Sequence, residues 1–107
     1  MNLAWTYLFI AGVLEIGWPR GFKLSQTTSY RVVFILTAVV CMALSGVFLW
    51  LAQREIPIGT AYAVWTGIGA AGTFLIGVFV FNDPASMLRI LSFLLIVTGV
   101  IGLRISI

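Results

Sequence analysis

Glu15 is the side chain in this sequence with the clearest chemical potential. It lies within residues 3–19, an apolar stretch that holds no other charged residue. Placing a carboxylate at the centre of a membrane costs about 2.5–3.5 kcal/mol on insertion scales, and the chain has only three acidic residues in all. A carboxylate kept at that depth is a candidate functional group, and its natural ligands are a proton or a cation.

Small and aromatic residues surround Glu15 at helical spacing. Gly12 and Trp18 stand three residues before and after it, so all three share one helix face. The missing side chain of Gly12 leaves room beside the acid. Pro19 has no N–H, so the carbonyl of Glu15 loses the donor it would have in a regular helix. A simple packing kink at Pro19 is the alternative interpretation.

Three more side chains bring polar or aromatic chemistry to later apolar stretches. Ser45 has a hydroxyl that can donate to a carboxylate, although an intramembrane serine more often bonds back to its own helix. Tyr62 and Trp65 lie deeper in their stretch than interfacial anchors usually do, and their ring faces attract cations. Gly67 and Gly69 follow, and we expect them either to bend the helix or to let another helix pack closely.

The chain that must position these groups is almost entirely apolar. Of its 107 residues 62% are hydrophobic and 8% are charged, which leaves no polar shell for a soluble domain. About 20 apolar residues span a bilayer. We therefore predict a single all-α integral membrane domain, residues 1–107, without cofactor or nucleic-acid partner. Its four expected transmembrane helices cover about residues 3–22, 31–52, 57–81 and 86–104.

Composition also bears on other functional classes. The sequence has no His and one Cys, so metal ligation lacks its usual ligands. The net charge of +3 comes without a basic cluster, which is typical of membrane-flanking residues rather than a nucleic-acid surface. We find no nucleophile–base pair and expect no enzyme. The first stretch has no basic residue before it and contains an acid, so we do not interpret it as a cleavable signal peptide.

Basic residues are balanced between the two membrane sides. With four spans, Arg54 and Arg104 share the side of the N-terminus, whereas Lys23, Arg31 and Arg89 lie on the other. The positive-inside rule then gives little preference. Insertion in both orientations would allow an antiparallel dimer with one shared site. A single orientation is the alternative, and charge alone does not decide between them. Because four helices make a thin bundle, a transport role implies an oligomer.

The sequence resembles the small multidrug resistance family over nearly its whole length. The resemblance rests on Gly12-x-x-Glu15-x-x-Trp18, on the long motif of residues 57–69 (PIGTAYAVWTGIG) and on residues 99–104 (GVIGLR). The motif of residues 57–69 is the most specific of the three. Trp18 and Ser45 make the chain look most like the guanidinium exporter subtype.

This resemblance implies a function and an assembly. Family members of this kind are antiparallel, dual-topology homodimers in the bacterial inner membrane that exchange protons for a cation by alternating access. The resemblance assigns proton and substrate binding to Glu15, orientation of its carboxylate to Trp18 and Ser45, and the pocket lining to Tyr62 and Trp65. The fourth helix would supply much of the dimer contact.

Two alternative functions stay open at this point. The first is a multidrug exporter of quaternary ammonium or lipophilic cations. The second is a non-transporting subunit, such as one half of a heterodimer. Pro19 and Arg20 depart from the small or aliphatic residues expected there. Arg20 is about 140° around the helix from Glu15 and about 7.5 Å along it. We interpret it as a side chain that reaches the membrane interface, where it could also repel a cationic substrate.

Overall fold

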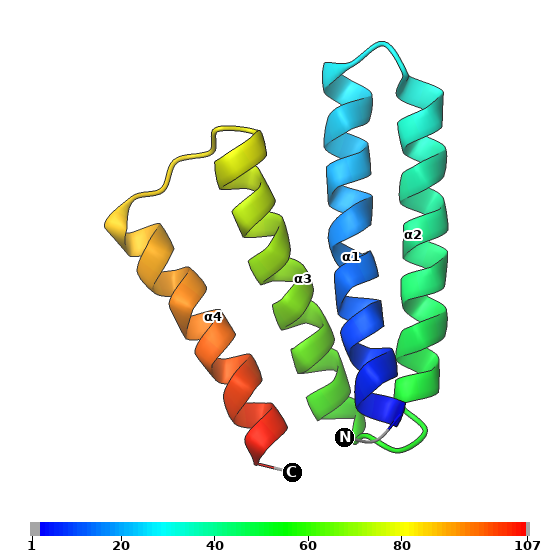
Figure 1. The fold of residues 1–107 in the computed structure, drawn as a ribbon, viewed down its shortest axis with the longest axis vertical. Helices are drawn as coiled ribbons and strands as arrows, with labels where there is room; N and C mark the ends of the chain where they lie inside the picture. The colour runs from blue at the N-terminus through cyan, green and yellow to red at the C-terminus, as the bar shows by residue number, and fades with distance from the viewer. Residues whose placement is uncertain (1–2, 107) are drawn as a thin grey trace.

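The computed structural model describes residues 3–106, and they form four helices. These are α1 (Leu3–Thr27), α2 (Arg31–Ala52), α3 (Ile58–Val80) and α4 (Met87–Ile105). Both ends of the described chain lie at the same end of the bundle (Figure 1). The prediction of an all-α fold with four helices is confirmed.

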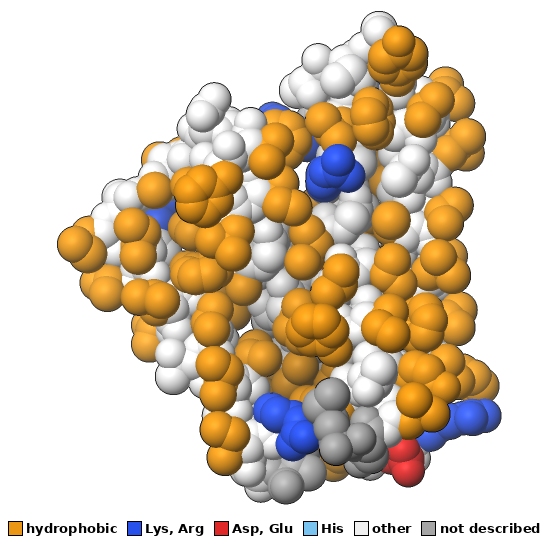
Figure 2. Space-filling model, viewed as in Figure 1, with side chains coloured by type: hydrophobic (Ala, Val, Ile, Leu, Met, Phe, Trp, Pro, Cys, Tyr) orange, Lys and Arg blue, Asp and Glu red, His pale blue; other side chains and the backbone are white. Residues whose placement is uncertain are grey.

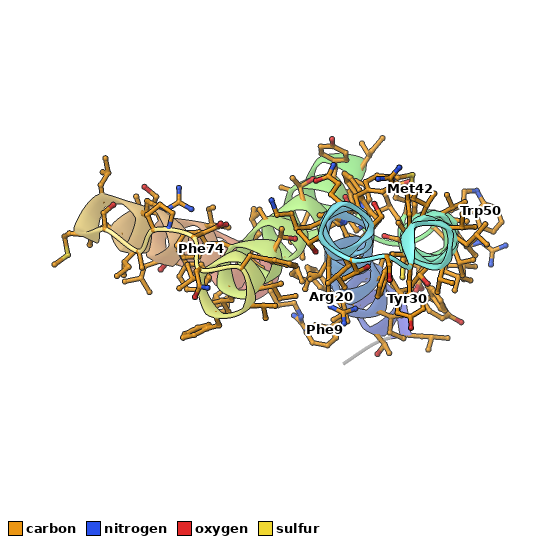
Figure 3. The ribbon with its side chains drawn as sticks, turned by 90° about the horizontal axis from the view of Figure 1, so that it is seen from above. Phe9, Arg20, Tyr30, Met42, Trp50 and Phe74 are labelled. Atoms are coloured by element: carbon orange, nitrogen blue, oxygen red, sulfur yellow. The ribbon has the colours of Figure 1, made fainter. Side chains whose placement is uncertain are left out.

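The helices form one thin layer rather than a round bundle. In Figure 1 the order across the layer is α4, α3, α1 and α2. Figure 3 shows the same row from above, and the smallest extent of the molecule is 19 Å. Because α1 lies between α2 and α3, the carboxylate that it carries is the one most enclosed by this single chain.

Small side chains bring α1 and α2 into close contact. A methyl group added at Gly17 would lie 2.7 Å from the Cys41 sulfur, and one added at Gly21 would lie 3.0 Å from the Ala38 Cβ. These distances leave no space for a larger residue on α1. Small residues allow this approach in membranes, where helix association depends on van der Waals packing. Ala38 and Cys41 of α2 therefore face α1.

The first helix is longer than the sequence indicated. We expected it to end near residue 22, but it continues to Thr27. Ser25 is buried and donates to the Phe22 carbonyl over 2.6 Å, and Thr27 donates to the Lys23 carbonyl over 3.1 Å. Hydroxyls that donate to a carbonyl of the preceding turn are compatible with a helix. The contact of Gly21 with α2 also stabilises the last turns of α1. The predicted connection from Lys23 to Arg31 is therefore mostly helical.

Three of the described helices, namely α2, α3 and α4, are long and apolar enough to cross a membrane. The fourth, α1, has sufficient length but contains Glu15, Pro19, Arg20 and Lys23. Hydrophobic side chains cover the middle of the face in Figure 2, and Lys and Arg side chains lie toward its ends. This distribution matches a bilayer with two polar boundaries.

The last helix is the least enclosed of the four helices. No residue of α4 is buried. It packs on α3, where the rings of Phe74 and Phe93 are stacked with centroids 5.2 Å apart. Val100 fills the space left by Gly67 so closely that a methyl group at Gly67 would collide with it. One side of α4 is thus packed against α3, and the rest of its surface is exposed.

Candidate functional site

Glu15 of α1 is half-buried, and its side chain packs against Gly69 of α3. A methyl group at Gly69 would lie 2.6 Å from the Glu15 Cγ. The carboxylate accepts a hydrogen bond of 2.7 Å from Trp18 Nε1 to its Oε1. The Trp18 ring is itself held by Phe22 in an edge-to-face contact, with centroids 5.7 Å apart. Trp18 on the same helix therefore orients the carboxylate, and Gly69 of α3 leaves the space that the Glu15 side chain occupies.

The local sequence explains how one helix supplies both partners. Glu15 and Trp18 are three residues apart and so lie on one face of α1. The helix continues through Pro19, whose missing N–H leaves the Glu15 carbonyl without its intrahelical donor. The backbone oxygen and the side-chain oxygens of Glu15 are therefore both acceptors that an incoming donor could use.

Ser45 occupies a different position from the one the sequence suggested. It is fully buried on α2, yet it donates neither to the Glu15 carboxylate nor to its own helix. Its hydroxyl donates to the Ala11 carbonyl on α1 over 2.8 Å. In a helix this carbonyl is the acceptor for the N–H of Glu15. The prediction of a direct Ser45–carboxylate bond is thus wrong for this conformation, because the hydroxyl reaches the backbone of α1 one turn before the acid.

The same hydroxyl joins a third helix to the site. Trp65 of α3 donates its indole N–H to the Ser45 oxygen over 2.8 Å. One serine therefore connects α3, α2 and α1 through two hydrogen bonds. No buried side-chain N or O atom within residues 3–106 is left without a partner. This link fixes the relative positions of the three helices around Glu15.

The glycines predicted near the site are packing positions in the structure. Gly12 admits Ile68, since a methyl group there would lie 2.7 Å from the Ile68 Cγ2. Gly69 admits Glu15, and Gly67 admits Val100. Helix α3 continues without interruption through both of the latter positions. Of the two alternatives from the sequence, close packing is the one these contacts support.

Tyr62 and Trp65 form an aromatic pair on α3. Their ring centroids are 5.4 Å apart. Tyr62 is 57% exposed, so within one chain it lies at the edge of the site rather than inside an enclosed pocket. Trp65 is half-buried because its indole reaches toward Ser45.

Two participants in this arrangement were missing from the sequence prediction. The Ala11 carbonyl is the acceptor for Ser45, and Ile68 fills the space at Gly12. Backbone acceptors leave no trace in residue type. The contact of Ile68 could only have been found by aligning the small residues of α1 with the bulky ones of α3, and sequence alone does not give the register between two helices.

Comparison with known proteins identifies the family of this chain. Residues 3–96 match the family described as Small Multidrug Resistance protein. A guanidinium exporter from Yersinia pseudotuberculosis serotype I is 47% identical over 104 residues, covering 97% of this chain and 99% of that protein. Guanidinium exporters from Proteus vulgaris and Salmonella typhimurium strain LT2 are each 42% identical over 104 residues. They also cover 97% of this chain, and the aligned regions span 99% and 98% of those proteins. The chain belongs to the small multidrug resistance family.

Proposed function

We propose that this chain exports guanidinium and small guanidinyl cations in exchange for protons, by alternating access at a site built around Glu15. Family membership makes it a transporter rather than an enzyme. Its apolar helices and its exporter relatives from bacteria make it a multi-pass protein of a bacterial inner membrane. The substrate proposal rests on the guanidinium exporters to which it is similar.

The observation that carries the proposal is the bond from Trp18 Nε1 to Glu15 Oε1, 2.7 Å long. A carboxylate has about four acceptor positions on its two oxygens. Trp18 uses one of them and fixes the plane of the group. The remaining positions suit a planar guanidinium, which presents its N–H donors as a fork and binds a carboxylate through two parallel hydrogen bonds.

Exchange follows from competition for the same oxygens. Apolar surroundings disfavour the charged form of a carboxyl group. A proton on Glu15 removes the charge and the acceptor positions that a guanidinium would use. A guanidinium bound to Glu15 in turn disfavours protonation. Binding of one ligand therefore promotes release of the other, and this coupling is what an antiporter requires.

The proposal gives the other site residues supporting roles. Trp18 orients the carboxylate directly, whereas Ser45 holds Ala11 and Trp65 and thereby the three helices around the acid. The exposed Tyr62 would line the pocket once a second copy faces it. These roles need no cofactor.

Assembly is the last part of the proposal. We take α1 as a fourth membrane span because it lies between α2 and α3 within one layer. A layer of four helices cannot enclose a solute. An antiparallel homodimer, or a heterodimer with a related chain, would bring two copies of Glu15 to one shared site.

The test uses the purified chain in proteoliposomes. Glu15→Gln keeps the shape of the side chain but removes its charge, so we expect it to abolish guanidinium uptake driven by a pH gradient. The matched control is Glu55→Gln, because Glu55 is exposed in the connection between α2 and α3. The control should transport like the wild type. Proton-driven guanidinium uptake by Glu15→Gln at the wild-type rate would reject the proposal.

A further inference from the structure

A pocket lined by both charged and apolar side chains lies between α1 and α3. Its volume is about 220 Å³, roughly the space of seven water molecules in the liquid. Arg20, Lys23 and Asp83 line it together with apolar residues that include Ile16 and Ile76. The pocket begins at Ile16, next to Glu15, and extends past the end of α3 to Asp83. The proposed exchange mechanism does not use its three charged side chains.

The acid of this pocket is placed by the turn after α3. Asn82 has a φ of 58°, a left-handed conformation that asparagine tolerates better than most residues. The chain then turns back, and the Asp83 N–H donates to the Gly77 carbonyl over 2.9 Å. The Asp83 carboxylate lies so close to Gly77 that a methyl group there would collide with it. The Gly77 position and the turn therefore direct this carboxylate to the pocket wall.

The charges of the pocket are arranged as two cations and one anion. Arg20 and Lys23 are three residues apart on α1, and Asp83 approaches from the connection between α3 and α4. Within residues 3–106 Asp83 has no ion pair with either basic side chain. All three are exposed. Such a pattern complements a ligand that carries a negative group next to a positive one.

The outer end of the pocket lies at the depth of lipid headgroups. Arg20 and Lys23 are about 7.5 and 12 Å along α1 from Glu15, and the pocket reaches the connection that follows Val80, the last residue of α3. The interfacial layer of a bilayer is about 5–8 Å thick on each side of the hydrocarbon core. Basic pockets between membrane helices are suited to lipid phosphates.

An apolar groove continues from this pocket toward the membrane interior. It is about 330 Å³ in volume and shares Ile16 with the charged pocket. Phe9 and Val13 of α1 and Leu75 of α3 also line it. Figure 3 shows Arg20 and Phe9 on the same side of the helix layer. A molecule with a charged head and an apolar tail would fit both parts at once.

We propose that this pocket binds the phosphoethanolamine headgroup of a membrane phospholipid. The phosphate lies at Arg20 and Lys23, where a guanidinium can donate two hydrogen bonds to it. The ammonium group lies at Asp83, which accepts its N–H donors. A choline headgroup has no N–H to donate to Asp83, and a glycerol headgroup has no positive charge to pair with the Asp83 carboxylate. A lipid acyl chain lies in the groove along Ile16 and Phe9.

Lipid binding does not depend on the proposed exchange, but a bound lipid should affect the rate of exchange. Arg20 adds a positive charge about 7.5 Å along α1 from Glu15. A phosphate bound at Arg20 neutralises that charge and removes the repulsion of a guanidinium cation. If exchange occurs as proposed, it should be faster in vesicles that contain phosphatidylethanolamine than in vesicles of phosphatidylcholine alone.

The first test is lipid retention by the purified chain, measured by native mass spectrometry in an equal mixture of phosphatidylethanolamine, phosphatidylglycerol and phosphatidylcholine. Arg20→Gln should lower retention of phosphatidylethanolamine about tenfold, the effect of losing a charge-assisted hydrogen bond. The matched control is Arg31→Gln, because Arg31 is exposed at the start of α2 and lies outside the pocket. Equal retention by both variants would overturn the proposal.

A second variant tests the assignment of the headgroup. Asp83→Asn should abolish the preference for phosphatidylethanolamine over phosphatidylglycerol, while phosphate binding at Arg20 persists. An unchanged preference would contradict the role of Asp83. Displacement of the lipid by an equal concentration of soluble phosphoethanolamine would assign the site to a free metabolite and also overturn the proposal. Glu15→Gln should retain the lipid while it loses exchange, so the two proposals fail separately.

Discussion

Polar side chains form hydrogen bonds between helices on one side of α3, whereas on the other side serine and threonine donate within a single helix. On one side, the Ser45 hydroxyl crosses to α1 and receives the indole of Trp65 from α3. On the other side, Ser92 and Thr98 of α4 each donate to a carbonyl of their own helix. The three helices α1, α2 and α3 are thereby held together as a unit around the carboxylate, whereas α4 is attached to that unit by apolar contact.

Glycines show the same contrast. Gly17 is filled by Cys41, so α1 and α2 could not approach each other with any larger residue at that position. Gly99 and Gly102 of α4 have no neighbouring atom within 4 Å of where a methyl group would stand. The site therefore needs the exact backbone positions of three helices, and α4 retains a small-residue surface that a second copy could cover.

The largest effect is expected from filling the glycines. Gly17→Leu should lower the free energy of unfolding by about 2–3 kcal/mol, because overpacking forces α1 and α2 apart. Gly99→Leu should change it by less than about 0.5 kcal/mol, as is usual for an open position. Unfolding in detergent, with copies diluted apart and helix content followed by circular dichroism, measures both. Equal losses would remove the contrast between the two sides.

The next effect concerns the two serines. Ser45→Ala removes the donor to Ala11 and leaves the Trp65 indole without an acceptor, so we expect a loss of about 1–2 kcal/mol. Ser92→Ala loses only a bond to its own helix and should stay within about 0.5 kcal/mol of the wild type. The same unfolding measurement applies. If the two variants prove equally stable, the cross-helix link does not hold the unit together.

The smallest effect concerns the orientation of the carboxylate. The Trp18 N–H fixes the plane of the carboxylate to which it donates. Trp18→Phe removes that donor and leaves the carboxylate free to rotate, so it is less well prepared to bind a guanidinium through two parallel hydrogen bonds. The dissociation constant for guanidinium should rise about three- to tenfold. Calorimetric titration at constant pH measures it.

The control for this prediction is Trp50→Phe. Trp50 is 60% exposed on α2, and its ring lies under Arg54 with the guanidinium carbon 4.9 Å from the centroid. Its dissociation constant for guanidinium should match that of the wild type. Tighter binding by Trp18→Phe, or an equal loss of affinity in both variants, would contradict a specific bond between Trp18 and Glu15.

Much of the fold was predictable because each helix is encoded locally. Apolar runs of about 20 residues placed α2, α3 and α4 to within a residue or two of where they begin and end. The end of α1 was missed, because a segment with Arg20, Lys23 and several hydroxyl residues has the composition of a connection. Its helical state depends on Gly21 and Ser25 being covered by the neighbouring helices.

For the site, the sequence by itself determined the acid, its tryptophan and the aromatic pair of α3. Glu15 and Trp18 share one helix face at a spacing of three, so their bond is a local property of α1. Only the tertiary structure decided where Ser45 donates, which residues fill the glycines and that Arg20 and Asp83 line one pocket. Those contacts depend on the register and distance between helices, and these are set by small-residue packing across the layer rather than by any single segment.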